Sequence, residues 1–240
     1  MSQALNDSAT VTYDLEEKVA VIRVDDGKAN ALGHEVLAGL EAGLDRADSD
    51  SAGAIVILGR EGKFSAGFDL SVMTSGPEQA RDLLARGARL GMSIFDSDRP
   101  VILGVTGHAL AMGAILLCCA DVRVGADGPY KLGLNEVRIG MPVPAFAVEL
   151  CRDRLAAPFF TQAVQLGHIH SPAEALAAGF LDELVELDQV SARSIAIAGE
   201  LAEAIHGGPF RTTRRTVRGE LLATLREGLE RDMSLFNIEA

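Results

Sequence analysis

Two short apolar segments are each followed at once by a stretch of small residues. Residues 54–58 (AIVIL) and 101–105 (VILGV) have the length and composition of buried strands. The first leads into residues 64–70 (FSAGFDL), and the second leads into residues 107–114 (GHALAMGA). Small residues let a ligand approach the backbone and leave main-chain N–H groups free to point at it. Two such turns on neighbouring strands predict an oxyanion hole, in which two N–H donors meet one oxygen.

The surrounding sequence alternates between strand and helix patterns. Strands are predicted at residues 19–24 and 121–125, and apolar residues at helical spacing predict helices over 34–47 and 77–96. Near-continuous apolar strands separated by helices are typical of an α/β fold whose parallel sheet is covered on both faces. The pattern alone does not distinguish a Rossmann-like sheet from another α/β architecture, and no clear internal repeat is present.

Strand patterns fade after about residue 142, and the remaining sequence favours helices. Ser171 and Glu174 have the spacing of a capping box, and Pro172 stands at the first helical position. With Gly179 as a C-terminal stop, residues 171–179 are predicted to form a short capped helix. Longer helices are expected over residues 188–204 and 209–236. The Gly-Gly-Pro sequence at 207–209 predicts a turn between them.

The composition fits one packed domain, or one domain with an appendage. Of the 240 residues, 48% are hydrophobic and 23% are charged, which excludes an intrinsically disordered chain. The net charge of −12 disfavours nucleic acid and anionic membrane surfaces as partners, because both are negatively charged. Residues 101–120 are apolar enough to imitate a membrane span, but their three glycines and His108 favour a buried strand, a turn and a buried helix.

The cysteine pattern disfavours both a disulfide framework and a zinc site. Cys118, Cys119 and Cys151 are odd in number, two of them are adjacent, and no C-x-x-C pair is present. The polar N-terminus lacks the apolar core of a signal peptide. We therefore expect a cytoplasmic protein without a metal site.

Several motifs resemble those of the crotonase superfamily, which contains the enoyl-CoA hydratases and isomerases. Residues 64–70 match the family pattern F-x-A-G-x-D-L, and residues 107–114 resemble its second turn, G-x-A-x-G-G-G. Residues 134–142 (LNEVRIGMP) resemble the segment that carries an active-site glutamate, and residues 28–32 (KANAL) resemble the loop that touches coenzyme A. Residues 171–179 are similar to a later family segment, so the resemblance extends over roughly residues 11 to 236.

The resemblance implies the architecture and the ligand. We expect a crotonase-type spiral of repeated β-β-α units over residues 1–168, and a C-terminal helical region over residues 169–240 that assembles a homotrimer or a dimer of trimers. The apolar positions of the last helix exceed what a lone terminal helix usually buries, which also favours assembly. The implied ligand is an acyl-CoA thioester, with coenzyme A as part of the substrate and no separate cofactor. Lys28 and Lys63 are the candidate cations for its phosphates.

The resemblance also implies roles for particular residues. Glu136 matches the catalytic acid–base, and the backbone N–H groups of Phe68 and Met112 match the oxyanion donors. The positions that match the family's CoA-contacting segments are Lys28, Ala29, Ala66, Gly67, Asp69 and Leu70. Among them, Asp69 is expected mainly to hold its loop. Asn30 is expected to form an Asx turn or to cap the following helix.

Two departures from the family pattern bear on the reaction. Ala111 and Met112 stand where the family usually has glycine, and the Met112 side chain is expected to narrow the site. Ile115 stands where many hydratases carry a second glutamate that helps to hold water. A single glutamate suffices for double-bond migration, so the sequence favours isomerisation of β,γ- to α,β-enoyl-CoA. Enoyl-CoA hydration and non-catalytic acyl-CoA binding are the alternatives.

Other classes of function receive less support. A hydrolase would need Ser65 as nucleophile and His108 as its base, but residues 62–67 do not form G-x-S-x-G, and a packed His108 is the commoner arrangement. A dinucleotide-binding enzyme is disfavoured because no G-x-G-x-x-G follows a strand.

Overall fold

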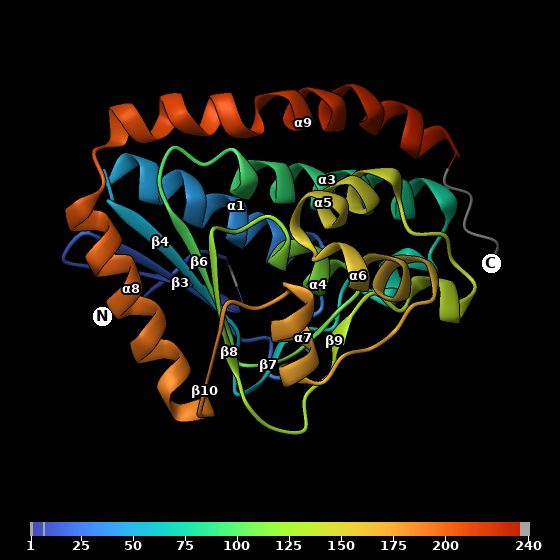
Figure 1. The fold of residues 1–240 in the computed structure, drawn as a ribbon, viewed down its shortest axis with the longest axis horizontal. Coiled ribbons are helices and arrows are strands. Elements are labelled where there is room, and N and C mark those ends of the chain that lie inside the picture. The colour runs from blue at the N-terminus through green and yellow to red at the C-terminus, as the bar shows by residue number, and fades with distance from the viewer. Residues whose placement is uncertain (1, 7, 236–240) are drawn as a thin grey trace.

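Two sheets form the centre of the molecule, which is described by a computed structural model over residues 2–6 and 8–235 (Figure 1). The larger sheet has the strand order β1-β2-β3-β4-β6-β8-β10, and the smaller has the order β5-β7-β9. In the larger sheet, β1, β2 and β3 pair antiparallel and the other neighbours pair parallel. The strands are β1 (Gln3–Ala4), β2 (Val11–Glu16), β3 (Val19–Val24), β4 (Ala54–Leu58), β5 (Gly62–Ser65), β6 (Val101–Val105), β7 (Gly107–Leu110), β8 (Val122–Ala126), β9 (Leu132–Gly133) and β10 (Glu183–Val185).

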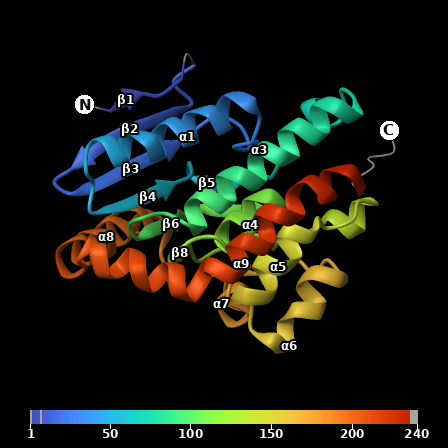
Figure 2. The same cartoon turned by 90° about the horizontal axis from the view of Figure 1, so that it is seen from above.

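The helices cover both faces of the larger sheet (Figures 1 and 2). One face packs against α8, and the other packs against α1 with α3 beside it. The α-helices are α1 (His34–Ser49), α2 (Leu70–Met73), α3 (Pro77–Phe95), α4 (Met112–Leu117), α5 (Ala145–Arg154), α6 (Ala157–Phe160), α7 (Pro172–Ala178), α8 (Val190–Ala204) and α9 (Gly207–Leu235). Shorter turns are the 3-10 helices η1 (Glu136–Ile139) and η3 (Leu187–Gln189) and the π-helix η2 (Thr161–Gln165).

The predicted α/β fold with repeated β-β-α units is confirmed. The chain passes from β4 to β5 and on to α2 and α3, then from β6 to β7 and α4, and then from β8 to β9 and α5. Each predicted small-residue turn therefore contains a short strand of the second sheet, which the sequence did not predict. All three strands of that sheet run parallel, so the segments that follow them are gathered at one edge.

Most predicted elements agree with the structure, and a few boundaries are corrected. The apolar residues 101–120 form a buried strand, a short second strand and a buried helix, as expected. The capped helix at 171–179 is confirmed by the reciprocal hydrogen bonds of its capping box. The turn expected at 207–209 is wrong, because α9 begins at Gly207 and the break falls at residues 205–206. None of the described helices is both long and apolar enough to cross a membrane.

The C-terminal region contributes to the same core. Within it, β10 pairs with β8 at the edge of the larger sheet, and this strand was not predicted. The boundary placed between residues 168 and 169 stays a prediction.

The last helix lies along α3 and α5 of its own chain (Figure 2). Its apolar side chains Leu222, Leu225 and Leu229 are buried there. The expectation that these positions exceed what the chain buries by itself is therefore wrong, because α3 and α5 already cover them. Phe236, where the sequence predicted that this helix ends, lies outside the described residues.

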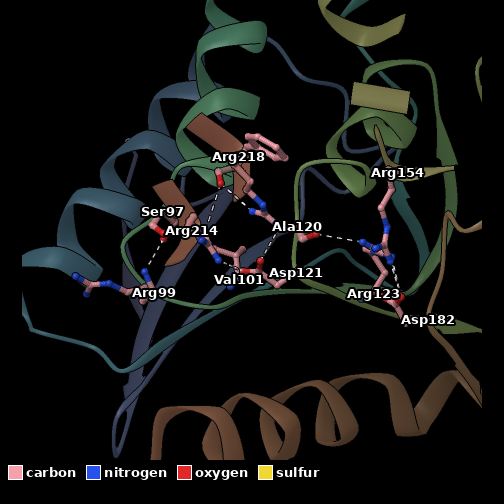
Figure 3. A network of polar contacts seen from close by, with 11 residues as sticks. Ser97, Arg99, Val101, Ala120, Asp121, Arg123, Arg154, Asp182, Arg214 and Arg218 are labelled. Atoms are coloured by element: carbon pink, nitrogen blue, oxygen red, sulfur yellow. Dashed lines mark hydrogen bonds and ion pairs between the residues drawn. The ribbon is translucent and has the colours of Figure 1, made fainter. Parts of the chain in front are cut away.

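Ion pairs fix α9 to Asp121, which directly precedes β8 and contacts the start of β6 (Figure 3). Asp121 accepts hydrogen bonds from Arg214 Nη2 at 2.6 Å and from Arg218 Nη2 at 2.9 Å. Asp121 also accepts from the backbone N–H of Val101 at 2.8 Å. Since the side chain of Arg214 is only 5% exposed, its charge depends on this carboxylate.

Candidate active site

A mostly apolar cavity of about 210 Å³ lies where the β-β-α units meet. The cavity walls come from the segment after β5, from α2, α3 and the start of α4, and from the region around η1. The lining residues are Ala66, Phe68, Leu70, Met73, Leu84, Ala111, Ile115, Asn135, Glu136, Ile139, Met141 and Pro144. The segments from both small-residue turns and the segment with the predicted glutamate therefore share one cavity.

The first turn presents the N–H group of Phe68. Gly67 has a φ of +95°, a left-handed conformation that favours glycine. The backbone around it is fixed by hydrogen bonds from Ala66 N to Ala29 O at 3.0 Å and from Leu32 N to Gly67 O at 2.8 Å. No hydrogen bond in the described part of the chain uses the N–H of Phe68. That donor is therefore available to a ligand.

The second turn presents the N–H group of Met112. Ala111 has φ +50° and ψ −125°, and its N–H donates to Gly133 O at 3.0 Å. The N–H of Met112 donates no hydrogen bond within residues 2–6 and 8–235. A Cβ atom placed on Gly67 would lie only 3.4 Å from Met112 N, so the two turns are in close contact. The pair of free donors is what an oxyanion hole requires.

The side chain of Met112 does not narrow the cavity. It is fully buried, and its Cε atom lies near Gly87 and Gly91 of α3. It is not among the residues that line the cavity. The expectation that it would intrude on the site is wrong, because α3 lacks side chains at the two positions where Met112 packs.

Glu136 is the carboxyl group that lines this cavity. It is the first residue of η1 and is only 7% exposed. Its Oε2 atom is buried and has no hydrogen-bond partner among the described residues. Burial raises the pKa of Glu136 above that of an ordinary glutamate, since the surroundings disfavour its charged form. Such a carboxyl is suited to accept and return a proton.

The cavity wall is mostly apolar, with Asn135 as a polar neighbour of Glu136. Ile115, at the position where many hydratases carry a glutamate, lines the cavity and is 1% exposed. Asn135 lines it too, and its Oδ1 atom is buried without a partner in the described chain. Sequence reasoning quoted Asn135 only as part of a motif. Met73 and Leu84 were also missed as lining residues, because a helical apolar pattern does not show which side chains face a cavity.

The loop predicted to contact CoA lies beside the first turn. Lys28 is exposed, and the backbone oxygen of Ala29 accepts from Ala66 N. Asn30 is fully buried and joins this loop to β5, since its Nδ2 donates to Val24 O at 2.8 Å and to Phe64 O at 3.3 Å. The Asx turn or helix cap expected for Asn30 is wrong. The carboxylate of Asp26 instead accepts from the N–H groups of the turn.

Asp69 and Leu70 begin the next helix. Asp69 caps α2 by accepting hydrogen bonds from Ser71 N at 2.8 Å and Ser71 Oγ at 2.6 Å. This agrees with the expected structural role in holding the loop. Leu70 lines the cavity but is 67% exposed, so it lies at the mouth.

The geometry of Ser65 does not support a hydrolase. Ser65 Oγ donates to Asn30 O at 2.8 Å and accepts from Gly67 N at 3.1 Å. His108 Nδ1 accepts from Lys131 N at 3.0 Å instead of contacting Ser65. Ser65 thus supports the turn, and His108 is packed as expected. Among the described residues, no group of three or more His, Cys, Asp or Glu side chains has the arrangement of a metal site.

Comparison with known proteins agrees with this geometry. The sequence profile of the enoyl-CoA hydratase/isomerase family matches residues 14–238. Mitochondrial enoyl-CoA delta isomerase 1 of Mus musculus is 32% identical over 183 residues, which are 75% of this chain and 63% of that protein. This chain therefore matches slightly less than two thirds of the mouse protein's length.

Solved structures show the same fold over nearly the whole chain. An enoyl-CoA hydratase/isomerase family protein from Pseudomonas syringae has a TM-score of 0.93 and 38% identity, covering 96% of this chain and 99% of that one. An enoyl-CoA hydratase from Mycobacterium marinum has a TM-score of 0.90 and 38% identity, covering 95% and 100%. The names of these relatives include both isomerases and hydratases. The chain belongs to the enoyl-CoA hydratase/isomerase family of the crotonase superfamily.

Proposed function

We propose that this enzyme converts β,γ-enoyl-CoA into α,β-enoyl-CoA. Glu136 takes a proton from the α-carbon. The C–H electron pair becomes a double bond between the α-carbon and the carbonyl carbon, and the carbonyl π pair moves onto the thioester oxygen, which gives a dienolate conjugated with the β,γ double bond. The N–H groups of Phe68 and Met112 donate to that oxygen and stabilise the dienolate. The Glu136 carboxyl then returns the proton to the γ-carbon, so the substrate and the product differ only in the position of the double bond.

The observation that carries this proposal is that Glu136 supplies the one carboxyl group among the described residues that line this mostly apolar cavity. Hydration needs a water molecule held against the β-carbon, and Ile115 offers it no hydrogen bond. Isomerisation needs one base beside a held dienolate, and a mostly apolar cavity disfavours the stray water that would protonate the enolate. Coenzyme A enters as part of the substrate, beside Lys28, Ala29 and the exposed Ala66.

Hydration is the second candidate because named relatives include hydratases, such as the one from Mycobacterium marinum. The test compares two rates on one enzyme preparation with substrates of equal chain length. One rate is the conversion of β,γ- to α,β-enoyl-CoA, and the other is the loss of α,β-unsaturation in water. We expect the first to be faster. Faster hydration would refute the interpretation of Ile115.

The Glu136→Gln variant separates catalysis from binding. Glutamine keeps the shape of the side chain but cannot accept the proton, and a positioned general base contributes about 100- to 10,000-fold. We expect kcat of the variant to fall by at least about 100-fold. A saturated acyl-CoA should still bind to it in calorimetry. Near-normal turnover would exclude Glu136 as the base. Binding without turnover in the unmodified protein would indicate a non-catalytic acyl-CoA-binding protein.

We also propose a cytoplasmic homotrimer or dimer of trimers, on the family resemblance alone, since the leucines of α9 are covered within the chain. Light scattering at micromolar concentration tests the assembly, and a monomer mass would contradict it.

A further inference from the structure

The mouth of the cavity has an exposed apolar rim. Leu70 of α2 and Ile139 of η1 both line the cavity, yet they are 67% and 56% exposed. Val137 and Leu166 are also large, apolar and exposed, and a Cβ atom on Gly167, next to Leu166, would lie 2.8 Å from Val137 Cγ2. Val137 shares η1 with Ile139, and Arg138 Nε donates to Leu166 O at 3.3 Å. Several large apolar side chains gathered beside a cavity mouth mark a binding surface.

Part of the cavity wall consists of buried apolar side chains. Met73, Leu84, Ile115 and Pro144 line it from four different segments, and all four are buried. The first two are only 6% and 2% exposed. An acyl chain that enters past the N–H groups of Phe68 and Met112 therefore meets a packed wall.

The cavity is small in relation to a fatty acyl-CoA. Its volume of about 210 Å³ lies below the roughly 300–1,000 Å³ of pockets that bury a drug-sized ligand. The thioester group and the α-, β- and γ-carbons must lie inside it, because the proposed reaction brings them to Glu136 and the two N–H donors. Carbons beyond the γ-position have little room inside, and the rim offers the adjoining apolar surface.

From this geometry, and resting on the proposed function, we infer that the distal acyl carbons leave the cavity and lie against the rim of Leu70 and Ile139. The substrates are then medium- and long-chain enoyl-CoA thioesters, not only short ones. Because the rim is open, each added pair of carbons finds apolar surface without meeting the wall of Met73 and Leu84. Coenzyme A leaves the cavity beside Ala66 and Ala29.

The test measures kcat/KM for β,γ-hexenoyl-CoA and β,γ-dodecenoyl-CoA on the unmodified enzyme and on variants of the rim. Ile139→Ser and Leu70→Ser each remove one apolar side chain that is already exposed, so the fold is retained. We expect each variant to lower the ratio of kcat/KM for dodecenoyl-CoA to kcat/KM for hexenoyl-CoA by about fourfold. This factor corresponds to the free energy of exposing one buried methylene group to water. Leu15→Ser is the matched control, since Leu15 is 44% exposed on β2 and does not line the cavity.

An unchanged ratio in both rim variants would overturn the inference. The rim variants could instead lose kcat/KM equally with both substrates while an oligomer dissociates in light scattering. That result would show that the rim is a subunit interface, and it would also overturn the inference. If the unmodified protein converts neither thioester, the proposed function fails. Calorimetry with hexanoyl-CoA and dodecanoyl-CoA still tests the rim in that case, because Ile139→Ser should reduce the preference for the longer chain by a similar factor.

Discussion

Replacement of Gly67 by alanine tests the pair of N–H donors without removing any side chain. A Cβ atom at this position would lie 2.8 Å from Ala111 Cβ and 3.1 Å from Leu110 O. Real Cβ atoms do not approach another carbon that closely, so the second turn must move away from the first. Met112 N lies in the displaced segment, 3.4 Å from the same Cβ position. The N–H groups of Phe68 and Met112 would no longer converge on one oxygen.

The expected loss of turnover follows from this displacement. Removal of one oxyanion donor typically costs about 100- to 1,000-fold in kcat, and we expect Gly67→Ala to fall in that range. The variant also places alanine at a φ of +95°, which costs about 1–2 kcal/mol in the left-handed region. For a chain of this length, that strain lowers Tm by about 2–8 °C.

Gly62→Ala is a matched control for the backbone strain. Gly62 has a φ of +75°, and no heavy atom lies within 4 Å of its Cβ position. The Gly62→Ala variant should lose about as much thermal stability as Gly67→Ala. It should keep its turnover, because the new Cβ atom displaces no neighbouring segment. The assay compares kcat for β,γ-enoyl-CoA isomerisation and the thermal melting of both variants. Full turnover in Gly67→Ala, or an equal loss in Gly62→Ala, would refute the reasoning.

Three further predictions concern charge. Burial raises the pKa of Glu136, so the stabilising effect of its bound proton is lost as the pH rises through that pKa. Glu136→Gln should therefore raise the Tm of the protein at about pH 8 and change it little at about pH 4. A lower Tm of the variant at the higher pH would contradict this. Asp121→Asn should cost about 3 kcal/mol, since it removes the carboxylate paired with buried Arg214. Asp98→Asn is the control and should cost less than about 1 kcal/mol of stability in thermal melting, because the ion pair of Asp98 is exposed. Equal losses of stability in the two variants would argue against a special role for the pair of Asp121 with Arg214. Ile115→Glu should raise the ratio of hydration to isomerisation at least about 10-fold, and a folded variant with an unchanged ratio would exclude Ile115 as the determinant.

Short-range patterns were sufficient to predict the main elements. Residues 54–58 and 101–105 form strands with the predicted bounds because each is buried on both faces, which leaves an apolar run without alternation. The helix at 171–179 was predictable because its capping box and final glycine act through local hydrogen bonds. The strands β5, β7 and β9 were not, since they are short and their pairing partners lie far away in the sequence.

The candidate site was only partly predictable for the same reason. Glu136 and the two turns carry recognisable motifs, so their shared cavity was expected. The role of Asn30 depends on its contact with Phe64 O of β5, which no local pattern reveals. The burial of the α9 leucines depends on α3 and α5, which cover their side chains within the chain. Such long-range contacts decided where sequence reasoning was wrong.

The packing of α3 explains how a methionine can stand where the family usually has glycine. A Cβ atom on Gly87 would lie 2.4 Å from Phe68 Cε1 and 3.6 Å from Met112 Cε. A Cβ atom on Gly91 would lie 3.7 Å from the same Met112 Cε. The side chains of both donor residues thus pack into space that α3 leaves open. This packing accommodates a side chain at each donor position, so the backbone there does not require glycine. The two proposed oxyanion donors therefore depend on α3, a helix that lines the cavity through Leu84.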